Sequence, residues 1–189
     1  MTIAIFILIT TVVYSLAFYN KLKTIQVHIK ASVQEIGNQL KRQSSLIPNL
    51  VSSVKGFMKH EKGIFEKLTK ARQLIDSKDI KKLDKSQDLI NQAIKSIQVI
   101  VESNPEIKSD KLVSNLMNEL RDTADKLMYS RRTLIDLSAD FNQAISVIPG
   151  IWLASIFKFK TQKGLSTPTQ GQHLEVSATD TKTPSVKLD

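Results

Sequence analysis

Residues 2–20 constrain this chain more than any other stretch, because they contain no charged side chain and residues 3–18 are almost continuously apolar. An α-helix rises about 1.5 Å per residue, so these residues span about 27 Å, close to the thickness of the apolar core of a bilayer. We therefore predict a membrane anchor over residues 1–20. The side chains expected to face lipid are Ile3, Ile5, Phe6, Ile7, Leu8, Ile9, Val12, Val13, Leu16 and Phe18.

The basic residues around the anchor predict its orientation. Only Met1 precedes the apolar run, whereas basic side chains follow it at Lys21, Lys23, Lys30, Lys41 and Arg42. Short flanks that are rich in Lys and Arg stay in the cytoplasm. We expect the N-terminus outside and the bulk of the chain in the cytosol, a reducing compartment that suits a chain without cysteine.

A cleaved secretory signal peptide is the alternative interpretation of the same segment. Ser15-Leu16-Ala17 resembles the small-x-small pattern that precedes a cleavage site. Signal peptides normally open with a basic region, and no basic side chain precedes this apolar run. We favour the uncleaved anchor, and a secreted helical protein that begins at Phe18 is the alternative.

The formal net charge of +9 lies outside residues 164–189, which hold only Lys182 and Lys187 against three acidic residues. Acidic lipids attract nearby Lys and Arg side chains by about 1 kcal/mol each. Nucleic acid is the weaker expectation, because no zinc-finger spacing, helix-turn-helix pattern or aromatic-rich basic strand accompanies the charge. We expect the membrane, and no nucleic acid, as the anionic partner.

Four segments after the anchor carry apolar residues at alternating spacings of three and four, the pattern of helices that bury one face. The first continues from the anchor, ends near Gln43 and has the stripe Leu22, Ile25, Ile29, Val33, Ile36 and Leu40. The second begins at Ser45 as N-cap, with Pro48 in its first turn, and ends before residues 76–79. Its stripe is Ile47, Leu50, Val54, Phe57, Glu61, Ile64, Leu68, Ala71 and Ile75.

The third stripe ends before Asn104, because Pro105 pushes that residue out of helical geometry, and comprises Ile80, Leu83, Gln87, Ile90, Ile94, Ile97 and Val101. The fourth ends at Pro149-Gly150 and comprises Val113, Leu116, Leu120, Ala124, Leu127, Arg131, Leu134, Ser138, Phe141, Ile145 and Ile148. Four such helices bury their stripes most simply as an antiparallel four-helix bundle over residues 21–160. We predict an all-α fold without a sheet, and a disordered tail over residues 161–189, where large apolar residues are few.

Four antiparallel helices would bring residues 149–160 back to the membrane surface. Trp and Phe favour the headgroup boundary, and lysines there reach lipid phosphates. We expect an interfacial set of Lys21, Lys23, Trp152, Phe157, Lys158 and Lys160. The alternative, which the sequence supports equally, is that Trp152 and Phe157 cap the core of the bundle.

The sequence contains no recognisable catalytic or metal-binding pattern. His60-Glu61 begins like a zinc-protease motif, but the position four residues after His60 is Ile64 and not a second histidine. The chain also lacks a glycine-rich phosphate loop, a G-x-S-x-G turn and any cysteine. We therefore expect no catalysis, no cofactor and no metal.

Two charged residues interrupt the apolar stripes, Glu61 in the second and Arg131 in the fourth. A single buried charge is costly, whereas a buried pair with hydrogen bonds can fix the register of two helices. We predict that Glu61 and Arg131 form such a buried polar pair. The alternative is that each lies at the edge of its stripe with its charged end in water.

Residues 39–51 read QLKRQSSLIPNLV. They are followed by VKGF at residues 54–57 and by His60-Glu61. This pattern closely resembles the signature of the LemA family of bacterial membrane proteins. Further matches are Tyr19-Asn20, Ala71-Arg72, Glu102 with Pro105, Glu119-Leu120, Arg131-Arg132, Phe141-Asn142, Pro149 and Phe159-Lys160. The resemblance covers residues 1 to about 160. It implies one transmembrane helix of N-out orientation in the bacterial inner membrane, a cytoplasmic four-helix bundle and no established catalytic activity.

We expect a membrane-anchored scaffold whose bundle binds a protein partner, or a second copy of itself, at the inner face of the membrane. Candidate contact residues are Lys41, Arg42, Lys55, Lys59, Lys62, Lys81 and Lys82. Asn49 is expected to be a turn residue. A second hypothesis is a sensor of anionic lipid or envelope state, in which the basic bundle and the Trp152 segment bind acidic headgroups.

Overall fold

The computed structural model describes residues 1–58, 62–77, 79–162 and 164–165. Within them lie α1 (Thr2–Val54), the 3-10 helix η1 (Lys55–Phe57), α2 (Lys62–Ile75), α3 (Ile80–Ser103), α4 (Pro105–Lys108), α5 (Lys111–Ser146) and α6 (Gly150–Ile156). No strand occurs in the described residues, and the predicted all-α fold is confirmed.

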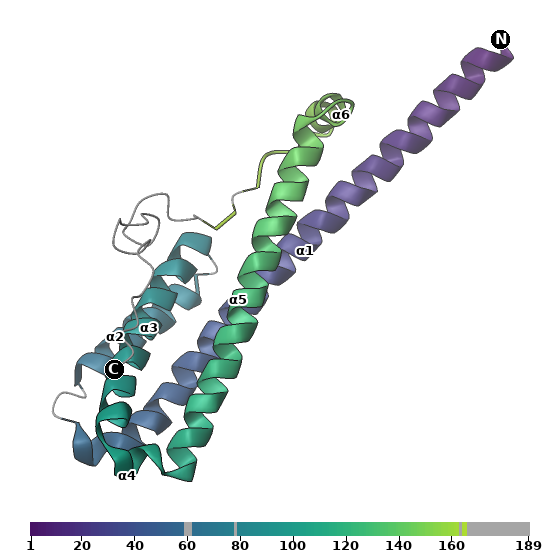
Figure 1. The fold of residues 1–189 in the computed structure, drawn as a ribbon. Helices are drawn as coiled ribbons and strands as arrows, with labels where there is room; N and C mark the ends of the chain where they lie inside the picture. Colours follow the sequence, from purple (N-terminus) through teal and green to yellow (C-terminus); the bar gives the residue numbers. More distant parts are fainter. Residues whose placement is uncertain (59–61, 78, 163, 166–189) are drawn as a thin grey trace, which may run out of the picture.

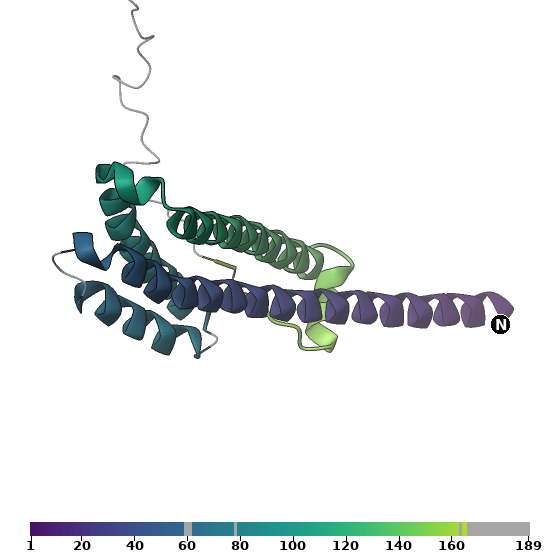
Figure 2. The ribbon, with the colours of Figure 1, turned by 90° about the horizontal axis from the view of Figure 1, so that it is seen from below.

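Two long antiparallel helices form the frame of the molecule. α1 and α5 lie side by side, and the α2–α3 hairpin packs against the half of α1 that is farther from the N-terminus (Figures 1 and 2). The short helix α4 connects α3 to α5, and α6 lies across the end of α5 beside α1. The N-terminal part of α1 extends beyond α5 as a single projecting helix (Figure 2).

The projecting part of α1 carries the predicted anchor. Among the described residues, α1 is the one helix that is long and apolar enough to span a membrane, and its most apolar 18-residue window has a mean hydropathy of 2.1. No residue of that window is buried, so the expected lipid-facing side chains from Ile3 to Leu16 are exposed, while Phe18 is partly covered. The chain therefore has a candidate membrane span near its N-terminus.

α1 passes through Ser45 and Pro48 without a break, so the predicted start of a second helix at Ser45 is wrong. The Ser45 hydroxyl donates to the carbonyl of Lys41, one turn earlier in the same helix, at 3.0 Å. Pro48 has no N–H to donate to the carbonyl of Ser44. The guanidinium of Arg72 in α2 donates to that carbonyl at 2.8 Å. Arg72 thus supplies from another helix the hydrogen bond that Pro48 cannot make, and α1 continues.

The second predicted helix is interrupted after Val54. α1 ends at Val54, η1 follows, and α2 begins at Lys62. Gly56 stands in this break, and glycine is among the poorest helix formers. Val54 and Ile64, on either side, are both buried. The buried part of the stripe therefore belongs to the end of α1 and to α2 and not to one helix, and the predicted stripe residue Phe57, in η1 between them, is exposed.

The core follows the apolar stripes of the four main helices. Its largest fully buried side chains are Phe141, Leu22, Ile36, Leu40, Ile47, Leu50, Leu83, Ile90, Ile97, Leu134, Gln43 and Val51. Two positions of the fourth stripe differ. Ile148 lies beyond the end of α5 and is exposed, and Thr123 is buried in place of the predicted Ala124, which is exposed. The Thr123 hydroxyl donates to the carbonyl of Leu120 at 2.8 Å, so a polar side chain is buried there with a hydrogen-bond partner.

Aspartates begin two helices of the bundle. The Asp79 carboxylate accepts hydrogen bonds from the backbone N–H groups of Lys81 and Lys82 at 2.9 and 3.2 Å, and α3 starts there. The Asp110 carboxylate accepts from the N–H of Val113 at 2.9 Å at the start of α5. Such caps satisfy N–H groups that lack a partner in the first turn. They fix the α2–α3 and α4–α5 reversals that make the bundle antiparallel.

Candidate functional site

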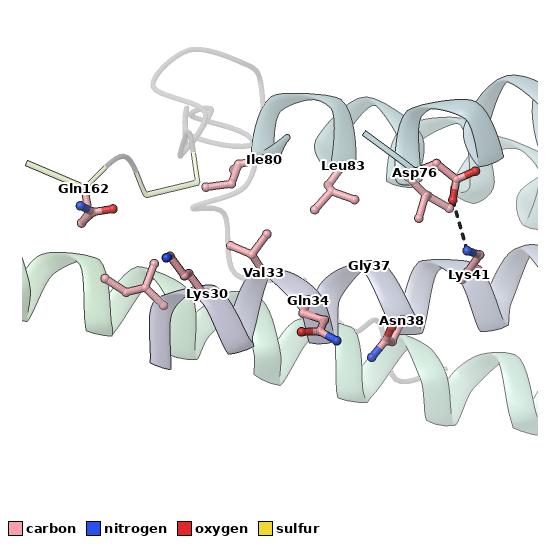
Figure 3. A pocket seen from close by; sticks show the side chains of 12 residues that line it. Lys30, Val33, Gln34, Gly37, Asn38, Lys41, Asp76, Ile80, Leu83 and Gln162 are labelled. Carbon is pink, nitrogen blue, oxygen red and sulfur yellow. Dashed lines mark hydrogen bonds and ion pairs between the residues drawn. The ribbon is translucent and has the colours of Figure 1, made fainter. Parts of the chain in front are cut away.

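A groove runs along α1 at the point where the α2–α3 hairpin ends (Figure 3). Its cavity measures about 580 Å³. We call it the α1 groove. It is lined by Ile29, Lys30, Val33, Gln34, Gly37, Asn38 and Lys41 of α1, Ile75 and Asp76 at the end of α2, Ile80 and Leu83 of α3, and Gln162.

The wall of the α1 groove that α3 forms is apolar, and the wall that α1 forms has both apolar and polar side chains. Ile80 and Leu83 of α3 lie opposite α1 in Figure 3, while Gln34 and Asn38 stand one turn apart on α1. The space above Gly37 is open, because a Cβ atom there would have only the Leu83 Cδ2 atom within 4 Å, at 4.0 Å. Such a surface suits a segment that has one apolar and one polar face.

One charged pair closes the hairpin end of the groove. Lys41 Nζ lies 3.2 Å from Asp76 Oδ1, and both side chains are about two-thirds exposed, at 65% and 67%. An exposed ion pair contributes about 0–1 kcal/mol. This end of the groove can therefore open at little cost, and both charges are accessible to a partner.

The chain returns to the bundle after α6 and forms the other end of the groove. The Asn142 side chain of α5 donates to the carbonyl of Gln162 at 2.9 Å and accepts from the N–H of Gln162 at 2.8 Å. Leu165 is buried, and Gly164 lies against Ser138. Packing therefore continues past the predicted boundary at residue 160, because one asparagine satisfies both backbone groups of Gln162. The rest of the predicted tail, residue 163 and residues 166–189, lies outside the described residues.

Aromatic side chains hold α6 and the following residues against α1. The ring of Tyr19 lies 5.0 Å from that of Phe157 and 5.7 Å from that of Phe159, and Phe141 of α5 lies 6.0 Å from Phe159. The ammonium of Lys23 lies 5.5 Å from the ring centres of both Tyr19 and Phe159. These contacts join the end of the bundle to α1 directly after the candidate span.

The structure separates the two aromatic residues that the sequence grouped together. Phe157 is partly buried in the aromatic cluster, whereas Trp152 is 62% exposed on α6. Ile151 and Ile156 of α6 are also exposed. Trp152 therefore does not cap the bundle core, and it forms part of an exposed apolar surface at this end of the molecule.

The expected interfacial lysines lie at the same end. Lys21 follows the candidate span on α1, and Lys158 and Lys160 follow α6. All three are exposed. The sequence between Phe141 and Gln162 contains no acidic residue, and neither does the sequence before Glu35. Residues 1–34 and 141–162 therefore carry basic charges only, and Asp140 stands directly before the second stretch.

Arg131 is paired in the structure, and its described partners come from α3. Its Nη1 atom lies 2.6 Å from Asp84 Oδ1 and 2.6 Å from Gln87 Oε1. The Arg131 and Asp84 side chains are 25% and 22% exposed. Glu61, the predicted partner, lies outside the described residues. Gln87 also interrupts an apolar stripe, so two polar interruptions on adjacent helices meet here.

The predicted contact residues spread over the bundle instead of forming one patch. Lys41 pairs with Asp76, Arg42 Nη2 lies 3.7 Å from Glu119 Oε2, and Lys59 lies outside the described residues. The others, Lys55, Lys62, Lys81 and Lys82, are exposed on η1, α2 and α3. Asn49 is within α1, so its predicted place in a turn is wrong for the reason given for Pro48.

Two residues with structural roles entered the sequence analysis only as matches to the family pattern, and no role was predicted for either. Arg72 completes the hydrogen bonding of α1, and Asn142 holds Gln162. The signal for Arg72 was Pro48 itself, because a proline inside an otherwise continuous stripe leaves a carbonyl without a donor. Asn142 had no comparable signal, since its partner is a backbone twenty residues later.

The described residues contain no group of three or more His, Cys, Asp or Glu side chains that could hold a metal ion. Of the three histidines only His28 lies among them.

Comparison with known proteins agrees with the resemblance that the residues carry. A search of curated proteins returned no match. The model of the LemA family matches residues 32–178, from the bundle part of α1 to beyond α6. This match covers most of the chain and extends past residue 160, where the resemblance noted in the sequence ends. The chain, with its candidate membrane span and its bundle of long helices, belongs to the LemA family.

Proposed function

We propose that this protein is a membrane-anchored scaffold that catalyses no reaction and that binds a protein partner, or a second copy of itself, through the α1 groove. The observation that carries the proposal is the continuity of α1, which runs for 53 residues through the candidate span and into the bundle. In a continuous helix the candidate span fixes the position and orientation of the groove, because no hinge separates the two.

Helix geometry sets the height at which a partner would be held. The groove residues on α1 run from Ile29 to Lys41, and the candidate span ends near Phe18. At about 1.5 Å per residue, the groove lies about 17 to 35 Å beyond Phe18 along the helix axis. This height suits the membrane-proximal part of another membrane protein or a protein bound at the surface.

The charge distribution supports a cytoplasmic bundle. Lys21 and Lys23 directly follow the candidate span, and Lys or Arg in this position favours the cytoplasmic side. The chain contains no cysteine, so a single one can be introduced as a probe. With Lys62→Cys, an impermeant maleimide should label permeabilised cells and leave intact cells unlabelled. Labelling of intact cells would reverse the orientation.

Photo-crosslinking in cells tests the groove. p-Benzoylphenylalanine in place of Asn38 should form discrete adducts, whereas the same group in place of Val99, which is exposed on α3 outside the groove, should not. Gly37→Phe fills the groove and should abolish the adducts. Gly56→Phe is the matched control, because neither glycine would place a Cβ within 3.4 Å of another atom.

The identity of the adducts decides between the two kinds of partner. Two differently tagged copies of the chain should crosslink to each other if the groove binds itself, and a second polypeptide should appear if it binds another protein. Equal adducts from Asn38 and Val99, or adducts that survive Gly37→Phe, would exclude the groove as the binding surface.

A second candidate function is favoured by the exposed apolar and basic end of the bundle. Trp152 and Lys158 would then bind an acidic membrane surface, and the contact would vary with lipid composition. Trp152 is the only tryptophan, so the fluorescence of the full chain in lipid nanodiscs reports on it directly. A sensor requires a blue shift as acidic lipid increases and its reversal by salt, whereas a scaffold alone requires neither.

A further inference from the structure

A second cavity lies between α1 and the turn that joins α5 to α6. It measures about 380 Å³. Tyr14, Phe18 and Lys21 of α1 line one side, and Val147, Ile148 and Gly150 line the other. We call it the anchor crevice.

The anchor crevice opens beside the last turns of the candidate span, so its surroundings are lipid if α1 is inserted. Its walls are apolar apart from Lys21 and the Tyr14 hydroxyl. Val147 and Ile148 on the turn are exposed, Ile148 by 71%. Such side chains are unfavourable in water and favourable against acyl chains. A crevice of this composition beside a bilayer suits a lipid chain better than water, because water there would find few hydrogen-bond partners.

The wall formed by the turn is fixed by close packing. A Cβ atom on Gly150 would lie 2.0 Å from the carbonyl oxygen of Ala144 and 3.0 Å from Phe18 Cζ. Only glycine permits this approach of α6 to both α5 and α1. The crevice is therefore part of the built fold and not a gap that side chains can close.

Charge at the mouth of the crevice selects the headgroup. Lys21 lines the crevice and lies one turn beyond Phe18, towards the water side of the span. No acidic residue lies before Glu35 or between Phe141 and Gln162. The Lys21 ammonium attracts a lipid phosphate. It attracts an acidic headgroup more strongly than a zwitterionic one, because the acidic headgroup carries no positive charge that offsets its phosphate.

We propose that the anchor crevice binds one acidic phospholipid of the surrounding bilayer, with an acyl chain between Phe18 and Ile148 and the phosphate at Lys21. This inference rests on the proposed insertion of α1 in the membrane. It does not depend on the α1 groove. The bound lipid would fill the space between anchor and bundle and so hold the bundle at one angle to the membrane.

Photolabelling of the full chain in nanodiscs tests the site. Phosphatidylglycerol that carries a diazirine in one acyl chain should label residues 14–21 and 147–150 above the level of the rest of the span, and labelled phosphatidylcholine should do so less. Ala17→Phe places a ring in the crevice and should remove the excess labelling. Ala4→Phe, the same change on the exposed span away from the crevice, should not.

Lys21→Gln should lower the preference for phosphatidylglycerol over phosphatidylcholine about fivefold, the factor expected for one lysine beside an acidic headgroup. Lys95→Gln, on α3 and outside both cavities, should leave the preference unchanged. Circular dichroism and gel filtration of each variant establish that it is folded.

The outcomes separate this proposal from the proposed function. Labelling that is equal along the whole span and insensitive to Ala17→Phe would overturn the crevice site while leaving the anchor in place. Absence of labelling anywhere on residues 3–16 would show that α1 is not inserted, and would overturn both. A site-specific excess that is equal for the two lipids would overturn the selection by Lys21.

Discussion

Replacing Arg72 by methionine should destabilise the bundle, and the loss should depend on whether residue 48 is proline. Arg72 donates to the carbonyl of Ser44, which is fully buried and which Pro48 leaves without its normal donor. Loss of a hydrogen bond with a charged donor costs about 1.5–3 kcal/mol, and the exposure of the rest of Arg72 places the expected loss at the lower end, about 1.5 kcal/mol.

Pro48→Ala supplies the missing N–H and creates the second arm of a double-mutant cycle. Alanine in a helix interior is favoured over proline by up to about 3 kcal/mol, so this variant alone should be more stable. In its background the carbonyl of Ser44 has an intrahelical donor, and Arg72→Met should cost about 0.5 kcal/mol or less. The coupling energy between the two positions should therefore be about 1 kcal/mol.

Urea unfolding of the full chain in non-ionic detergent micelles, followed by far-ultraviolet circular dichroism, measures each free energy of unfolding. Arg132→Met is the control for loss of an arginine, because the Arg132 side chain is 83% exposed and its nearest carboxylate oxygen is 3.9 Å away. It should change stability by less than about 0.5 kcal/mol. Effects of Pro48→Ala and Arg72→Met that add within about 0.3 kcal/mol would refute the reasoning.

Three further predictions test other contacts between distant parts of the chain. Gly150→Ala should lower the free energy of unfolding by about 1–3 kcal/mol in the same urea assay, because the new Cβ would collide with the Ala144 carbonyl. Gly63→Ala, where the new Cβ has open space, should not lower it. Asn142→Leu should speed hydrogen exchange of the Gln162 amide at least tenfold, because its acceptor is removed, and unchanged protection measured by mass spectrometry would contradict that contact. Arg131→Met should cost about 1–2 kcal/mol, because it leaves the partly buried Asp84 without its cation, and a stability equal to that of Arg132→Met would show that the pair contributes nothing.

Sequence reasoning succeeded where the information is local. Each apolar stripe was read from spacings of three and four, and side chains such as Leu40, Ile97 and Leu134 are buried as those spacings require. The end of α3 at Asn104-Pro105 also follows from adjacent residues. It failed at Ser45 and Pro48, because local rules read a serine followed by a proline as the first turn of a new helix and cannot detect a donor that arrives from another helix.

The amino-acid sequence by itself determined that this protein has an apolar segment long enough to span a membrane and helices that bury one face, because both depend only on residues within a few turns. The tertiary structure alone decided that α1 continues past Pro48, that Arg131 meets Asp84, and that Asn142 holds Gln162. It also decided that α6 packs beside the candidate membrane span and leaves a crevice there. The physical reason is that these features depend on which distant groups the packed helices bring within hydrogen-bond or van der Waals distance, and no local pattern records that distance.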